Sequence, residues 1–150
     1  MEITLGKYNI IITDSVINVL QAHIQHNPKD LESGGILLGK LTEKQIEVMK
    51  ASIPTQFDKA TRVTFERNKI SAQIIIDYEF ANSAGQTTYL GEWHTHPEPI
   101  PNPSDTDNKM IRQQFTKNII LTDFILLVIQ GQEKIYFSIL SKKDVIYTHL

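Results

Sequence analysis

The sequence predicts an α/β fold, a single domain with a mixed β-sheet and helices on both faces of the sheet. Apolar residues recur at helical spacing in separate segments, and short runs of β-branched and apolar residues alternate with these segments along the chain. The final apolar runs follow one another closely, which is typical of antiparallel hairpins, so the sheet is expected to contain both strand directions. The chain has 150 residues, of which 41% are apolar. This is enough for one domain with a proper core, and we expect residues 1–150 to form that domain.

Three segments are predicted to be helices. The first covers roughly residues 14–26, with Asp14 as its N-cap and apolar residues at helical spacing after it. The second covers residues 68–84, and Gly85 lies just beyond its end, where glycine commonly terminates a helix. The third, over residues 104–117, follows a proline-rich loop.

The predicted strands are short and rich in β-branched, aromatic or continuously apolar residues. They cover residues 36–38, 45–53, 63–65, 87–95, 124–129, 134–140 and 145–147. Residues 45–53 are expected to form a hairpin with 36–38, and the unbroken apolar run of 124–129 predicts a strand that is buried on both faces.

Charge and cysteine content exclude several classes of function. The 17 acidic and 15 basic residues give a net charge of −2, too balanced for binding nucleic acid or an anionic membrane through bulk charge. There are no cysteines, which excludes disulfide scaffolds, thiolate zinc sites, Fe–S clusters and cysteine nucleophiles. A metal would have to be held by histidine and carboxylate. The N-terminus lacks the basic and apolar regions of a secretory signal, so we expect a cytoplasmic protein.

The pair His94 and His96 is the first candidate for chemistry. The two residues are expected at the end of a strand, where side chains two positions apart face the same way and can converge on one ion. Pro97 then ends the strand. The alternative interpretation is two exposed histidines next to a loop.

The segment from Ser104 to Asp107 has two interpretations as well. A serine with an acidic residue three positions later is close to a capping box at the start of a helix. The same helix, coming directly after the loop that leaves the histidine strand, can aim Asp107 back at the strand end. His94, His96 and Asp107 would then be three metal ligands that leave a fourth position for water, which is the arrangement of a catalytic zinc site.

Glu32 lies just before two glycines, Gly34 and Gly35, at the start of a predicted strand. Taken alone, Glu32 reads as a solvated loop residue. The glycines either supply the dihedral angles of a turn or let the backbone approach a neighbouring group closely.

Together these residues resemble the JAMM motif of the JAB/MPN metalloprotease family. The motif is a Glu, then His-x-His-Pro, then a Ser separated from the second His by seven residues and an Asp three positions further on, and here it reads Glu32, His94-Thr95-His96-Pro97, Ser104 and Asp107. The resemblance covers about residues 10–140. The segments around the motif are similar to the bacterial branch, whose members are encoded beside E1- and E2-like enzymes, notably in CBASS antiphage operons, where the JAB protein removes a conjugated protein from its target.

The resemblance implies a JAB/MPN fold, which is broadly similar to that of cytidine deaminases, and a zinc ion held by His94, His96 and Asp107. It further implies that Glu32 is the general base and acid, and that Ser104 donates a hydrogen bond to the oxyanion unless its hydroxyl is used for the helix cap. The expected substrate is the amide bond between the C-terminus of a ubiquitin-like or conjugated protein and its target. E1- and E2-like enzymes are expected as partners. Binding to nucleic acid or to a membrane is not expected.

Two other functions stay open beside the zinc isopeptidase. One is a peptidase that processes a ubiquitin-like precursor or releases a C-terminal adduct. The other is a non-catalytic MPN scaffold, although such members usually lack ligands that are present here. Deamination is excluded, because the zinc deaminases use cysteine ligands and this chain has none.

Overall fold

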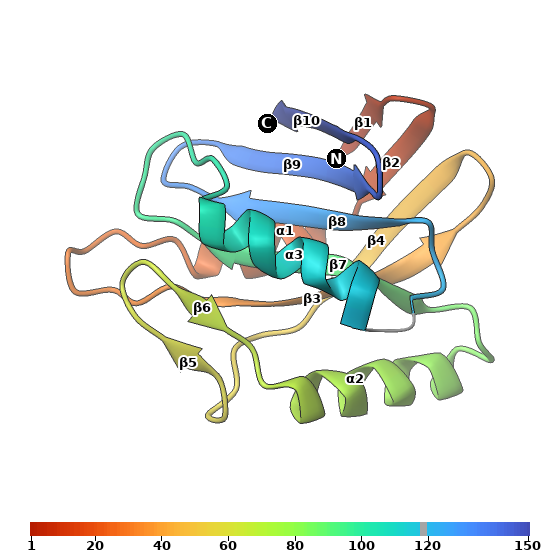
Figure 1. Ribbon diagram of the computed structural model, residues 1–150, viewed down its shortest axis with the longest axis horizontal. Helices are drawn as coiled ribbons and strands as arrows, with labels where there is room; N and C mark the ends of the chain where they lie inside the picture. The colour runs from red at the N-terminus through yellow and green to blue at the C-terminus, as the bar shows by residue number, and fades with distance from the viewer. Residues whose placement is uncertain (118–119) are drawn as a thin grey trace.

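The core of the protein is one large mixed β-sheet (Figure 1). The computed structural model describes residues 1–117 and 120–150. In chain order the eight strands of the sheet are β1 (Glu2–Leu5), β2 (Tyr8–Ile12), β3 (Gly34–Leu41), β4 (Gln45–Ala51), β7 (Thr88–Thr95), β8 (Phe124–Gln130), β9 (Ile135–Ser141) and β10 (Val145–His149). Their spatial order is β1-β2-β4-β3-β7-β8-β9-β10. Two further short strands, β5 (Lys59–Ala60) and β6 (Phe65–Glu66), form a separate hairpin.

Both strand directions occur in the sheet, as the sequence predicts. The pairs β2–β4 and β7–β8 are parallel, and the remaining neighbours are antiparallel. Strand β7 lies between β3 and β8, with His94 opposite Gly34 of β3 and opposite Ile129 of β8. The end of β7 that carries the two histidines is therefore supported on both sides.

Three helices cover the two faces of the sheet. Helix α1 (Asp14–Ala22) buries Val16 and Leu20 against one face, whereas α2 (Lys69–Asn82) and α3 (Asp105–Lys117) pack on the other. Apolar side chains alternate along the strands, so each face has its own core: the α1 side includes Leu37, Trp93 and Leu126, the α3 side Ile125, Leu127 and Ile129, and the α2 side Ile36 and Leu38. The prediction of helices on both faces is confirmed.

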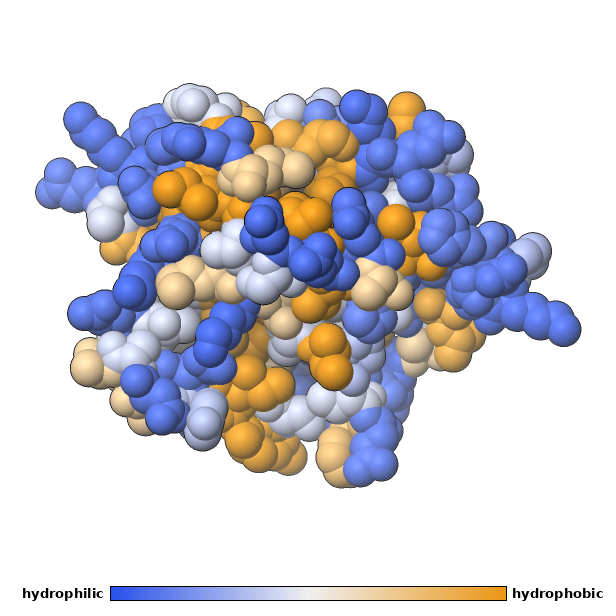
Figure 2. Space-filling model, turned by 180° about the vertical axis from the view of Figure 1, so that it is seen from behind, coloured by the Kyte–Doolittle hydropathy of each residue, from blue (hydrophilic) through white to orange (hydrophobic). Residues whose placement is uncertain are grey.

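The face covered by α1 is seen in Figure 2. Hydrophilic side chains surround smaller apolar patches there, as expected where a helix shields the apolar face of a sheet (Figure 2).

No helix in the two described ranges is long and apolar enough to cross a membrane.

Some predicted boundaries are wrong, and the N-terminal hairpin was not predicted. Thr13 occupies the N-cap position of α1 without a side-chain hydrogen bond, so Asp14 is its first helical residue. The helix ends at Ala22, earlier than predicted, and Gln25 beyond its end is buried. Strands β1 and β2 form a hairpin with each other, and β2 also pairs with the distant β4. The strand expected at 63–65 overlaps β6 at Phe65, and its partner β5 lies in a segment for which the sequence predicts no strand.

The two glycines that open β3 are needed because the chain passes close to its neighbours. A Cβ atom on Gly34 would lie 2.5 Å from the Phe65 ring and 2.7 Å from the carbonyl oxygen of Trp93, and one on Gly35 would collide with Ser52. Neither glycine has a positive φ. The close-approach interpretation therefore holds, and it places the start of β3 directly against the histidine end of β7.

Candidate metal centre

The two histidines on β7 converge as the strand pattern predicts. His94 and His96 are 8% and 7% exposed, and their Nε2 atoms lie 3.2 Å apart. Trp93, on the opposite face of the strand, is buried in the core beside α1. The histidines therefore form a buried pair at the strand end, and the interpretation as exposed residues is wrong.

Asp107 brings a carboxylate to the same point from the first turn of α3. Its Oδ1 atom lies 3.3 Å from Nε2 of His94, and its Oδ2 atom lies 3.3 Å from Nε2 of His96. Burial raises the pKa of Asp107, but hydrogen bonds from the two histidines outweigh burial and hold the pKa well below its usual range. The carboxylate is therefore ionised and ready to bind a cation.

These three side chains fit one metal ion. Each offers one ligand atom, and the ligand atoms all lie within 4.8 Å of one another. A tetrahedral ion with bonds of about 2.0–2.1 Å to nitrogen and oxygen places its ligand atoms roughly 3.3 Å apart. The 3.2 Å between the two Nε2 atoms matches this spacing, and each imidazole has one oxygen of Asp107 at 3.3 Å, Oδ1 for His94 and Oδ2 for His96.

Glu32 reaches the cluster from the loop before β3. Its side chain is buried, and Oε1 lies 3.8 Å from Nε2 of His96. Burial raises the pKa of Glu32 to about 8; the positive charge of His96 opposes this rise, and the negative charge of Asp107 adds to it. The interpretation of Glu32 as a solvated loop residue is wrong.

Ser104 forms the predicted capping box at the start of α3. Its backbone N–H and its hydroxyl both donate to Oδ2 of Asp107 at 2.7 Å, and Oγ accepts from the backbone N–H of Asp107 at 3.1 Å. The capping carboxylate is also the one that faces the histidines. Asp107 therefore takes part in the capping box and faces the two histidines at the same time, so the two interpretations of this segment do not exclude each other.

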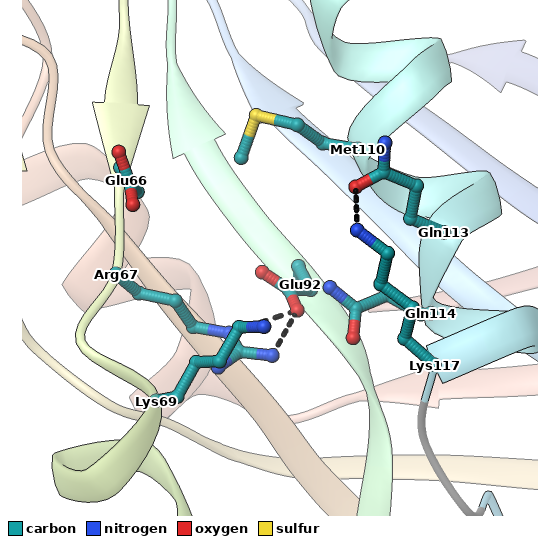
Figure 3. A pocket seen from close by; sticks show the side chains of 8 residues that line it. All are labelled: Glu66, Arg67, Lys69, Glu92, Met110, Gln113, Gln114 and Lys117. Carbon is teal, nitrogen blue, oxygen red and sulfur yellow. Dashed lines mark hydrogen bonds and ion pairs between the residues drawn. The ribbon is translucent and has the colours of Figure 1, made fainter.

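A groove adjoins the cluster and contains residues that the motif did not indicate (Figure 3). It has a volume of about 270 Å³ and lies between the β6–α2 junction, with Glu66, Arg67 and Lys69, and helix α3, with Met110 and Lys117. A smaller pocket that includes His94 and Asp107 shares Glu92 and Met110 with this groove.

The floor of the groove is formed by a charged network around Glu92 of β7. Arg67 donates from Nε and Nη2 to Oε1 of Glu92 at 2.8 and 2.7 Å, and the hydroxyl of Tyr89 donates to the same oxygen at 3.0 Å. Because side chains alternate between the two faces of β7, Glu92 lies on the same face of the strand as His94. Nothing local in the sequence marks Arg67 as its partner, because the two residues are on different elements.

Fold and site together define a metal-dependent hydrolase of the JAB type. Residues 14–139 match the family described as prokaryotic homologs of the JAB domain, and the chain belongs to this family. A solution structure of a protein from Desulfitobacterium hafniense has the same fold, with a TM-score of 0.65 and 18% identity over 93% of this chain and 89% of that one.

Several curated relatives carry a more specific name. The chain is 39% identical over 93 residues to a CD-NTase/cGAS isopeptidase of Pseudomonas aeruginosa, an alignment that spans 62% of this chain and 59% of the relative. It is 32% identical to the protein of that name from Escherichia coli, over 91% of this chain and 85% of the relative. The chain is 33% identical to the protein of that name from Vibrio cholerae, over 90% of this chain and 82% of the relative. A probable metalloprotease of Sinorhizobium fredii is 33% identical over 55% of this chain.

Proposed function

We propose that this protein is a zinc-dependent isopeptidase that releases a conjugated protein from its target in a CBASS-type antiphage pathway. The observation that carries the proposal is the buried cluster of His94, His96 and Asp107, with Glu32 beside it. The names of the relatives support a CD-NTase/cGAS-type conjugate as the substrate. E1- and E2-like enzymes as partners, and the cytoplasm as the site of action, belong to the same proposal.

In the proposed site, His94, His96 and Asp107 hold the zinc ion. Two imidazoles and one carboxylate suit zinc, and three protein ligands leave room for water. A zinc ion bound here would lower the pKa of a water molecule and so supply the nucleophile.

Glu32 is the proposed proton carrier. Its carboxylate accepts a proton from the attacking water and passes the proton to the nitrogen of the leaving amine. A nearby cation favours the ionised form of Glu32, so a bound metal prepares this residue to act as a base.

Ser104 is the proposed donor to the oxyanion. Its hydroxyl lies at the ligand Asp107, and it can turn its hydrogen from Oδ2 toward the carbonyl oxygen of the substrate. The backbone N–H of Ser104 still donates to Asp107 after this turn, so the cap of α3 is preserved.

Two substitutions with a matched control test the proposal. Glu32→Gln should keep zinc but abolish cleavage of a lysine-linked conjugate, because the amide cannot accept the proton. Asp107→Ala should lose both zinc and cleavage, whereas Asp105→Ala, which removes an exposed acid from the same helical turn, should keep both. Zinc is measured by elemental analysis of the purified protein, and cleavage by gel electrophoresis.

The results also separate the three candidate functions. Efficient cleavage of a linear fusion, with none of the lysine-linked conjugate, would favour the processing peptidase. Wild-type protein that holds no zinc and cleaves neither substrate would leave the scaffold, whereas full activity of Glu32→Gln would overturn the proposed role of Glu32.

A further inference from the structure

A buried hydrogen-bond network lies behind the candidate metal centre, on the opposite face of β7. Thr95, between the two histidines in sequence, is 0% exposed. Its Oγ1 atom accepts from the backbone N–H of Ser33 at 3.0 Å and donates to Oε1 of Gln25 at 3.0 Å. The residue that accompanies the two histidines thus contacts the loop that carries Glu32.

Gln25 extends this network into the same loop. The side chain is 1% exposed, and its Nε2 atom donates to the carbonyl oxygens of Asp30 at 3.1 Å and of Arg62 at 3.0 Å. The side chain of Gln132 donates to the backbone carbonyl of Gln25 at 2.9 Å. The Gln25 side chain therefore joins the Glu32 loop, β7 and the turn between β5 and β6.

The backbone on both sides of Glu32 is fixed by further bonds. The N–H of Glu32 donates to the carbonyl of Thr61, and the N–H of Thr95 donates to the carbonyl of Ser33, both at 2.8 Å. By contrast, the carboxylate of Glu32 accepts no hydrogen bond from any residue in the described ranges, and its ion-pair partner there is His96 at 3.8 Å. The position of this carboxylate consequently depends on where its backbone is held.

A fully satisfied buried network of this kind selects one arrangement of the chain. Its groups are removed from water, so breaking one bond leaves a buried polar atom without a partner, which is unfavourable. The loop therefore has little freedom to relax while the network is intact.

We propose that Thr95 and Gln25 are positioning residues for catalysis: their buried hydrogen bonds fix the backbone over residues 30–33 and thereby hold the Glu32 carboxylate at the metal centre. The inference rests on the proposed function, in which Glu32 carries the proton. It assigns to Thr95 a role separate from that of the adjacent histidines, because the Thr95 side chain lies on the other face of the strand.

Thr95 offers a matched pair of substitutions for the test. Thr95→Val keeps the shape and removes the hydroxyl, whereas Thr95→Ser keeps the hydroxyl and removes a methyl group. We expect Thr95→Val to retain stoichiometric zinc and a KM within about twofold, while kcat falls about 10- to 100-fold through the displaced base. Thr95→Ser should keep kcat within about threefold of wild type, although it loses more buried apolar surface.

Gln25→Met provides a second variant, of similar length but without hydrogen-bond donors. It should reduce kcat like Thr95→Val, and the double variant should lose little more than either single one, because both act through one network. All kinetics are measured well below the unfolding midpoint of each variant. If Thr95→Val is too unstable to assay, Gln25→Met decides the question alone.

Three results would overturn this inference: wild-type kcat in the folded Thr95→Val or Gln25→Met protein, an equal loss in Thr95→Ser, or additive losses in the double variant. Glu32→Gln, assayed in parallel, separates this outcome from failure of the proposed function. An inactive Glu32→Gln beside an active Thr95→Val rejects only the positioning role. An active Glu32→Gln rejects the proposed role of Glu32 itself.

Discussion

At the scale of single residues, Glu32 behaves very differently from a glutamate side chain in water. Its pKa rises from 4.5 to about 8, chiefly because burial disfavours the carboxylate. The folded protein therefore retains a proton that the unfolded chain loses above pH 4.5. The stability that Glu32 contributes in the metal-free protein is fully present below that pH and is lost as the pH rises through about 8.

This difference gives a pH-dependent prediction for Glu32→Gln. The amide has no proton to lose, so in the presence of a chelator the variant should gain stability over wild type as the pH rises from 5 to 8.5. By the usual conversion of about 1.4 kcal/mol per pKa unit, the gain is on the order of a few kcal/mol. Thermal unfolding at each pH measures it, with Glu133→Gln at an exposed position as the control. If the difference in unfolding free energy between Glu32→Gln and wild type stays constant with pH, the raised pKa of Glu32 is contradicted.

At the scale of elements, the ion pair between Arg67 and Glu92 ties the β5–β6 hairpin to β7. Both side chains are mostly buried, at 15% and 17% exposure, and the pair lies on the floor of the groove that leads to His94. The neighbouring Phe65 lines the smaller pocket at the metal centre. The pair thus sets the position of one wall of the substrate path in the proposed function.

We therefore expect Glu92→Gln to act on substrate binding. Loss of the charged hydrogen bonds should lower stability by about 1.5–3 kcal/mol and raise KM several-fold, with zinc content and kcat nearly unchanged. Steady-state kinetics and denaturant unfolding measure the two effects. Glu66→Gln removes the same charge from another wall of the same groove. If Glu66→Gln raises KM as much as Glu92→Gln does, the effect on KM comes from the charge of the groove and not from the ion pair between Glu92 and Arg67.

The elements also show what a local pattern can predict. Helices α2 and α3 and the hairpin of β3 and β4 follow periodicity, caps and apolar runs, which depend on neighbours in sequence. The hairpin of β1 and β2 is not predicted, although β2 carries the β-branched run Ile10–Ile12, and the pairing of β2 with β4 is a long-range contact that no local pattern indicates. The candidate site shows the same contrast between local and long-range information. The spacing of the motif indicates the candidate ligands and Glu32, but it does not indicate Gln25 or Arg67, because their partners lie on distant segments of the chain.

At the scale of the whole molecule, the apolar cores on the two faces of the sheet are built from residues other than the candidate ligands. The candidate ligands are carried by β7 and α3, which are anchored in those cores through Trp93 and Ile111. We expect removal of the metal by a chelator to leave the fold intact and to lower the unfolding temperature, since an ion that binds only the folded state stabilises it by mass action.

Far-ultraviolet circular dichroism before and after chelation, with thermal unfolding of both samples, checks this expectation. The spectrum should be unchanged, and added zinc should restore the unfolding temperature. Collapse of the secondary structure on chelation would mean that the ion is part of the fold, as in small zinc domains.

The three candidate ligands lie close together in the sequence, within residues 94–107, whereas Glu32 lies on an earlier segment of the chain. This division has a consequence for how the protein matures in the cell. A chain that has brought the first turn of α3 to the end of β7 already presents all three ligands, and Glu32 joins them when the start of β3 pairs with β7. We therefore expect capture of the ion and placement of the proton carrier to be separate events. The choice between competing metals is then made by two imidazoles and one carboxylate, a set of donors that favours ions accepting a tetrahedral arrangement over those that demand an octahedral one.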